Sequence, residues 1–257
     1  YLLNSTSLNW KNNMILEKKY SCVSSSLPKG VDFLIQFVKE INESLPCLIF
    51  CPTKKNCEIS CENIAKYLSR DRSKIHERID LIKSLEYVTG GICSTLRGCI
   101  PRGIAYHHAG MADDERKIIE EAYLCGTIYI LCCTSTLAAG VNLPAFRVII
   151  KSPLVGIDIL NNVNYRQMVG RAGRPGLSES GESILMIEGN KKNYLDKIFE
   201  INNVCKSALA LISDDELSTI ILSLSNFRDS MEKNQIMEYF RNTLYFSQLS
   251  HENEKSE

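Results

Sequence analysis

The 257-residue sequence lacks the features that mark several large classes of protein. Its 30 basic and 30 acidic residues give a net charge of zero, so the overall charge does not indicate nucleic-acid binding. Any contact with a polyanion must be made by a local group of basic residues. No apolar run is long enough to cross a bilayer, and the opening residues are too short and too polar to begin a signal peptide. We therefore expect no membrane partner.

The eleven cysteines lack the spacing of a metal site or of a disulfide scaffold. No Cys-x-x-Cys occurs, and an odd number leaves one thiol unpaired. His107 and His108 are adjacent, so in a strand they point to opposite faces and cannot share a metal ion. We expect buried free thiols in a reducing compartment and no metal site.

A phosphate-binding loop of the form Gly-x-x-x-x-Gly-Lys-Ser/Thr is also absent, as is an Asp-Glu-x-His/Asp motif that could hold magnesium. The stretch most similar to the second motif is Asp-Asp-Glu-Leu at 214–217. Its carboxylates suit the first turn of a helix, where the dipole favours negative charge, so we interpret it as a helix start.

What the sequence does contain is an alternation of short apolar runs with helical patterns. Strands are expected at 47–51, 103–108, 128–133, 148–150 and 183–187. Helices are expected between them, with an inserted helix pair at 70–100. Continuous apolar runs are typical of parallel strands buried on both faces, so the pattern predicts an α/β fold with a mostly parallel sheet.

Three segments differ in character. Residues 1–28 are polar and are expected to be a linker or the end of a preceding domain. The α/β domain is assigned to 29–203, and only helices are expected in 204–257, a small all-α unit.

The most informative stretch is 165–176, Tyr-Arg-Gln-Met-Val-Gly-Arg-Ala-Gly-Arg-Pro-Gly. It predicts a helix from about residue 162 that ends in a glycine-rich turn, where another backbone or a ligand can come close. Arg171 and Arg174 are three apart, and two guanidinium groups on one face suit a polyphosphate. The alternative is that both pair with carboxylates on a surface helix, but glycine costs about 1 kcal/mol in such a helix.

Three further loops follow predicted strands. They are expected at the carboxyl ends of these strands, where ligands bind in open parallel sheets. They are Pro-Thr-Lys-Lys at 52–55, His-Ala-Gly at 108–110, and the hydroxyl-rich run 134–144. Each is weak evidence by itself, because a Ser/Thr cluster after a strand is more often a helix cap.

Together with their flanks, the four loops resemble motifs IV, IVa, V and VI of superfamily 2 helicases, in strings at 50–58, 105–110, 133–145 and 165–176. Within that superfamily the resemblance is to the polymerase-theta-like DNA repair helicases, known as helicase Q, and it extends through 181–185. It implies a RecA-like three-layer domain, the second of two motor domains, followed by the start of a winged-helix domain. It also implies ATP-driven 3′ to 5′ unwinding of DNA at stalled forks in the nucleus.

The resemblance also implies roles for single residues. Arg171 and Arg174 would stabilise charge on the γ-phosphate of ATP, and Gln167 would orient that site. The nucleotide would also meet Gly140, Asn142 and Gly170. Single-stranded and forked DNA would be gripped through its phosphates by Thr53, Lys54, Gly110, Thr134 and Thr136.

Since the phosphate loop and the magnesium carboxylate are missing, ATP and Mg²⁺ are expected to bind mainly to a first RecA-like domain outside this chain. The chain alone is then expected not to hydrolyse ATP. Two other functions stay open, an RNA helicase and a non-catalytic scaffold, although the presence of Gln167 and both arginines argues against the scaffold.

The connection 151–164 lies where the resemblance places a strand-separating hairpin. Leu154 and Val155 would then stack against the last base pair and help to unstack it. The alternative is that these apolar residues cover the edge of the sheet.

Overall fold

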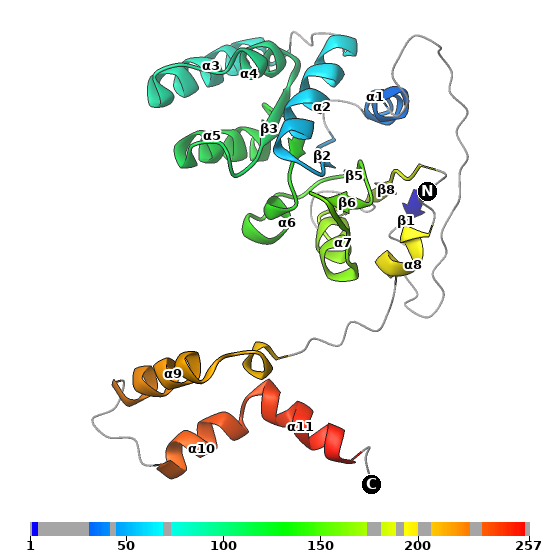
Figure 1. Ribbon diagram of the computed structural model, residues 1–257. Coiled ribbons are helices and arrows are strands. Elements are labelled where there is room, and N and C mark those ends of the chain that lie inside the picture. The colour runs from blue at the N-terminus through cyan, green and yellow to red at the C-terminus, as the bar shows by residue number, and fades with distance from the viewer. Residues whose placement is uncertain are drawn as a thin grey trace. The chain divides into compact units, whose positions relative to one another are not determined.

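The computed structural model describes residues 2–4, 31–41, 45–68, 73–173, 181–188, 193–199, 207–226 and 233–254. The chain divides into two compact units, Tyr1–Ile201 and Asn202–Glu257 (Figure 1). None of the described helices is long and apolar enough to cross a membrane.

The first unit is built on a six-stranded sheet in the order β1-β8-β5-β2-β4-β3. Its strands are β1 (Leu2–Asn4), β2 (Cys47–Phe50), β3 (Ile104–His107), β4 (Ile130–Cys133), β5 (Arg147–Ile150) and β8 (Glu182–Leu185). The five strands other than β1 are parallel, and β1 pairs antiparallel with β8. The predicted α/β fold with a mostly parallel, RecA-like sheet is confirmed.

The helices of this unit are α1 (Val31–Lys39), α2 (Lys54–Tyr67), α3 (Ile75–Thr89), α4 (Ser94–Cys99), α5 (Asp113–Leu124), α6 (Thr136–Gly140), α7 (Asn162–Val169) and α8 (Tyr194–Phe199). The steps from β2 to β3 and from β3 to β4 run in opposite directions across the sheet. Right-handed crossovers therefore place α2 and α5 on opposite faces, which gives three layers. The inserted pair follows this division, since α4 packs beside α2 and α3 beside α5 (Figure 1).

The core explains why the strands read as continuous apolar runs. Every residue of β2, β3, β4 and β5 is buried. A strand covered by helices on both faces has no solvent side, so apolar residues do not alternate with polar ones.

Some short elements were not predicted. Strand β1 lies within residues assigned to a linker, and helices α6 and α8 have five and six residues. Elements this short contain too few residues for a periodic pattern to show.

The second unit contains a 3₁₀ turn (Ala208–Ala210) and the helices α9 (Asp214–Asn226), α10 (Lys233–Arg241) and α11 (Leu244–Glu254). The expected helix start at 214–217 is confirmed, because the Ser213 hydroxyl accepts from the Glu216 amide at 3.3 Å and the Glu216 carboxylate accepts from the Ser213 amide at 2.9 Å. The sequence pattern predicts a third helix at 235–244 followed by a charged tail, and this prediction was wrong. Helix α10 ends at Arg241, and α11 begins at Leu244.

Candidate functional site

The predicted site residues follow strands that end together. Phe50 at the end of β2 is paired with Cys133 of β4 and Ile150 of β5, and His107 of β3 is paired with Cys133. The loops that leave these four strands therefore all start at the carboxyl end of the sheet. This is the end at which ligands bind in open parallel sheets.

Two of these loops bring Lys54 and Gly110 side by side. A Cβ atom added to Gly110 would lie 3.4 Å from Cδ of Lys54 and 3.2 Å from Nδ1 of His108. The Gly110 amide donates to that His108 nitrogen at 3.2 Å. A side chain at 110 would therefore press on the His108 ring and contact the Lys54 side chain.

The Thr53 hydroxyl caps helix α2 instead of pointing freely outward. It accepts from the Asn56 amide nitrogen at 3.2 Å and from the Asn56 side chain at 2.8 Å. The remaining amides of the first turn of α2 keep the positive end of the helix dipole, so a cap at this position is compatible with a phosphate nearby.

The adjacent histidines contact different helices, as the strand geometry predicts. His107 Nε2 lies 2.7 Å from Glu120 of α5, and His108 Nε2 lies 3.5 Å from Glu58 of α2. Burial lowers the pKa of His107, although Glu120 opposes this shift. The hydrogen bond from Lys55 lowers the pKa of the Glu58 carboxyl, so this carboxylate stays charged beside Lys55.

The loop after β4 gathers the next predicted residues. The Thr134 and Thr136 hydroxyl oxygens are 3.0 Å apart, and α6 starts at Thr136. Gly140 at its end and Asn142 just beyond are exposed. The structure therefore places one hydroxyl pair at the start of this short helix, one exposed residue at its end and another two residues further on.

Arg171 connects that loop to the arginine stretch. Its guanidinium donates to the Ala138 carbonyl and, at 3.4 Å, to Oδ1 of Asn142. The backbones are joined as well, since the Ala145 amide donates to the Arg171 carbonyl at 2.9 Å and the Gly173 amide donates to the Ala145 carbonyl at 3.0 Å. The two motifs thus share both side-chain and main-chain bonds.

The helix of the arginine stretch ends where the sequence predicts. α7 runs from Asn162 to Val169, Gln167 is exposed on it, and exposed Gly170 follows as its C-cap. The backbone just before β8 comes close to this stretch, because a Cβ added to Gly181 would lie 2.2 Å from the Gly173 nitrogen. Arg174 falls outside the described residues.

The connection after β5 forms a two-stranded hairpin of β6 (Leu154–Val155) and β7 (Asp158–Ile159). Leu154 and Val155 are half-buried in its stem, and Val155 packs against the core. Ile157 at the turn is 94% exposed. The resemblance assigns the stacking role to Leu154 and Val155 in the stem instead. The Gly156 amide donates to the Pro52 carbonyl at 2.8 Å, so the turn lies beside the start of α2.

Several known proteins have sequences similar to that of this chain. Residues 82–176 match the family described as helicase conserved C-terminal domain. The chain is 40% identical over 235 residues to "Helicase POLQ-like" of Homo sapiens, which covers 90% of this chain and 21% of that protein. It is 45% identical over 202 residues to the Drosophila melanogaster protein of that name, covering 75% and 19%.

An archaeal relative is more distant. "ATP-dependent DNA helicase Hel308" of Methanococcus vannielii is 33% identical over 253 residues, covering 94% of this chain and 33% of that protein. The chain thus spans between a fifth and a third of the length of these relatives. It carries the C-terminal motor domain of a helicase, and it belongs to the polymerase-theta-like group of superfamily 2 DNA helicases that includes the POLQ-like and Hel308 proteins.

Proposed function

We propose that this chain is the second motor domain of an ATP-dependent 3′ to 5′ DNA helicase that acts in repair at stalled forks in the nucleus. The name of the Methanococcus relative, an ATP-dependent DNA helicase, supports the reaction and the substrate. In this proposal ATP and Mg²⁺ are bound mainly by a first RecA-like domain of the same protein, and the helical unit begins a winged-helix domain.

On the nucleotide side, Arg174 and Arg171 stabilise the charge that develops on the γ-phosphate, and Gln167 orients the site. Gly140, Asn142 and Gly170 face the nucleotide. The observation that carries this assignment is the bond network of Arg171, which links the loop after β4 to the arginine stretch. An arginine in this position can respond to ATP and move the loop at the same time.

On the DNA side, Lys54 and Gly110 form one phosphate contact, with the amides of the Thr53-capped helix start beside them. Thr134 and Thr136 form a second contact through their paired hydroxyls. Contacts of this kind go to the backbone and read no sequence, which suits a motor that must move along any strand.

The hairpin of β6 and β7 is the proposed strand separator. Leu154 and Val155 support it from the stem, and the exposed Ile157 meets the last base pair. The bond from Gly156 to Pro52 keeps the turn beside the first phosphate contact, so the proposed separator and the proposed grip lie next to each other.

The arginine assignment is tested in the full-length protein with Arg174→Ala and Arg171→Ala. DNA-stimulated ATP hydrolysis should fall about 10³-fold or more in Arg174→Ala, while nucleotide affinity stays nearly unchanged, because an arginine finger acts mainly on the transition state. Arg97→Ala is the matched control, since this exposed arginine of α4 pairs with Glu86. A weak-binding Arg174→Ala variant that turns over normally at saturation would overturn the role.

The substrate is tested separately with forked DNA and forked RNA of the same sequence. Unwinding should require DNA and ATP. Preferential unwinding of RNA would favour an RNA helicase, and ATP-independent binding with no unwinding of either would favour a scaffold.

A further inference from the structure

The side chain of His108 ties down the loop that follows β3. His108 is 5% exposed, whereas the next two residues, Ala109 and Gly110, are exposed. Its Nδ1 accepts a hydrogen bond from the Gly110 amide at 3.2 Å, and its carbonyl accepts one from the Met111 amide at 3.1 Å. An exposed turn is thus bonded back to one buried residue through both its side chain and its main chain.

Two neighbours fix the orientation of the His108 ring. It stacks on the buried ring of Tyr106, with the centroids 5.2 Å apart and the planes 9° apart. Its Nε2 lies 3.5 Å from Oε1 of Glu58 on α2. This is longer than an ordinary hydrogen bond, and among the described residues the buried Nε2 has no hydrogen-bond partner. The ring therefore presents one nitrogen to the Gly110 amide and the other to a carboxylate.

These surroundings favour one form of the imidazole. Nδ1 faces an N–H group and accepts from it, so it carries no proton. Nε2 faces a carboxylate, which repels a lone pair and attracts an N–H group. With a proton on Nδ1, two N–H groups would face each other at Gly110. A ring with its single proton on Nε2 suits both neighbours.

The ring lies beside the proposed phosphate contact. A Cβ atom added to Gly110 would lie 3.2 Å from Nδ1 of His108 and 3.4 Å from Cδ of Lys54, so the ring and the lysine are on the same side of the glycine. Glycine has more backbone freedom than any other residue, and an exposed turn loses that freedom when it binds a ligand. The bond to Nδ1 removes part of this freedom in advance.

Glu58 lies one helical turn after Lys54 on α2. Its Oε2 accepts from Nζ of Lys55 at 2.8 Å, and its Oε1 faces His108. A carboxylate so near a phosphate contact opposes the binding of a polyanion by charge repulsion. Its contact with His108 gives this carboxylate a role that is compatible with DNA binding, since it holds the imidazole in the form that accepts from Gly110.

We propose that His108 is a positioning residue for the DNA-phosphate contact of Lys54 and Gly110, and that Glu58 keeps the imidazole proton on Nε2. The proposal rests on the proposed function, because it takes this contact to bind DNA. His108 itself contacts no DNA. It holds Gly110 against Lys54 before DNA arrives, so less of the loop has to be ordered on binding.

The role of His108 is tested in the full-length protein by its affinity for fluorescein-labelled oligo-dT, at one pH and one salt concentration, beside thermal unfolding. His108→Asn removes the stacked ring but keeps an acceptor, because an Asn side chain accepts from the amide two residues on in an Asx turn. Its melting temperature should fall, while its affinity stays within about twofold of the parent value. His108→Phe keeps an aromatic ring beside Tyr106 but has no acceptor. Its affinity should fall about fivefold, as expected for one hydrogen bond.

A purely structural role of His108 would give a different pattern. Affinity would then follow the melting temperature, and His108→Asn would lose DNA binding together with stability. That result, or a His108→Phe variant that binds as tightly as the parent, would overturn the proposal. If His108→Phe does not fold, His108→Ala, which also lacks an acceptor, takes its place in the comparison.

Lys54→Ala separates this proposal from the function on which it rests. Unchanged DNA affinity in Lys54→Ala would overturn the phosphate contact, and the role of His108 with it. Weaker binding by Lys54→Ala but not by His108→Phe would leave the contact in place and overturn the role of His108 alone. If both variants bind more weakly, adding His108→Phe to Lys54→Ala should cost less than about twofold, because both act on one contact. Fully additive losses would contradict the proposal.

The role of Glu58 is tested by a double-mutant cycle with His108→Asn. Loss of the negative charge should strengthen DNA binding in both backgrounds. With His108 in place, loss of the acceptor for Nε2 offsets this gain. The change in affinity caused by Glu58→Ala should therefore be about threefold less favourable in the parent than in the His108→Asn background.

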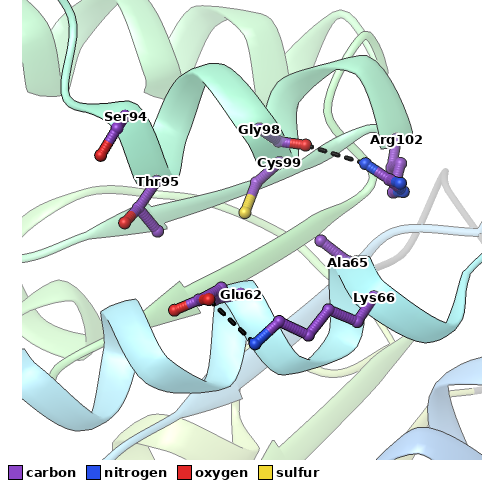
Figure 2. A pocket seen from close by; sticks show the side chains of 8 residues that line it. All are labelled: Glu62, Ala65, Lys66, Ser94, Thr95, Gly98, Cys99 and Arg102. Atoms are coloured by element: carbon purple, nitrogen blue, oxygen red, sulfur yellow. Dashed lines mark hydrogen bonds and ion pairs between the residues drawn. The ribbon is translucent and has the colours of Figure 1, made fainter.

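Glu62→Ala is the matched control for this cycle. Glu62 lies one turn beyond Glu58 on α2 and pairs with Lys66 at 2.9 Å, at the wall of a pocket between α2 and α4 (Figure 2). It takes part in none of the His108 contacts described above, so Glu62→Ala should change the affinity equally in both backgrounds. Equal effects of Glu58→Ala in the two backgrounds would overturn the role of Glu58.

Discussion

Replacing Ile157 by Ser tests the strand-separating hairpin more cleanly than any change in its stem. Ile157 is 94% exposed, so its truncation should change the free energy of unfolding by less than about 0.5 kcal/mol. Val155 packs against the core, and its replacement would mix a loss of stability with a loss of function. The turn residue separates the two effects.

The expected size of the effect follows from the surface that Ile157 can cover. Full burial of an aliphatic side chain stabilises by about 1.5–3 kcal/mol. Contact with one face of a base pair covers roughly half of the side chain, so we assign about 1 kcal/mol to it. Unstacking a step costs a few kcal/mol, so the side chain offsets only part of that cost. A barrier raised by about 1 kcal/mol slows unwinding about fivefold.

The assay is unwinding of a forked duplex by the full-length protein, beside DNA-stimulated ATP hydrolysis and thermal unfolding. Ile157→Ser should slow unwinding about fivefold and leave hydrolysis and melting temperature unchanged. Leu124→Ser is the matched control, since Leu124 is also an exposed aliphatic residue. It is the last residue of α5 and precedes the start of β4, at the end of the sheet away from the hairpin. Unchanged unwinding, or parallel loss of unwinding and hydrolysis, would refute the role of the hairpin tip.

Three further predictions follow from single contacts. Lys54→Ala in the full-length protein should weaken single-strand binding and reduce the salt slope by about 0.7, measured by fluorescence anisotropy at several salt concentrations. Gly103→Ala should destabilise the fold by about 2 kcal/mol or more in urea unfolding, because Gly103 has φ 71° and its added Cβ would lie 2.6 Å from the Tyr129 ring. Burial lowers the pKa of His107 in the folded protein below its value of about 6.5 in the unfolded chain. Its contribution to stability is therefore present above pH about 6.5 and is lost as the pH falls below that value. His107→Gln should reduce this pH dependence of the free energy of unfolding, measured from about pH 5 to 7.5.

The parallel sheet could be predicted because its strands are covered on both faces. Continuous apolar runs such as 47–51 and 128–133 have no other common explanation when helical patterns alternate with them. The edge strand β1 gave no such signal, since three residues that pair only with β8 need no apolar pattern. The central strands could thus be predicted from the sequence, and the edge strand β1 could not.

The hairpin shows a different limit. The apolar residues of 154–160 could be recognised from the sequence, but their exposure depends on where the turn falls. Gly156 has φ 63°, and with Ile157 it forms the turn between β6 and β7. This register directs Ile157 to solvent and Val155 to the core. A shift of one residue would exchange the two sides, and composition alone does not fix it.

The arginine stretch shows that the type of side chain does not determine where it lies in the structure. Arg171 and Arg174 carry the same group three residues apart, so the sequence predicts the same role for both. Arg171 lies after the last residue of α7, in the turn, and its guanidinium is bonded to Ala138 and Asn142. These bonds attach the Arg171 guanidinium to the loop after β4. We therefore expect Arg171 to keep the loop after β4 attached while ATP binds, so that a change at the nucleotide reaches the paired hydroxyls of that loop.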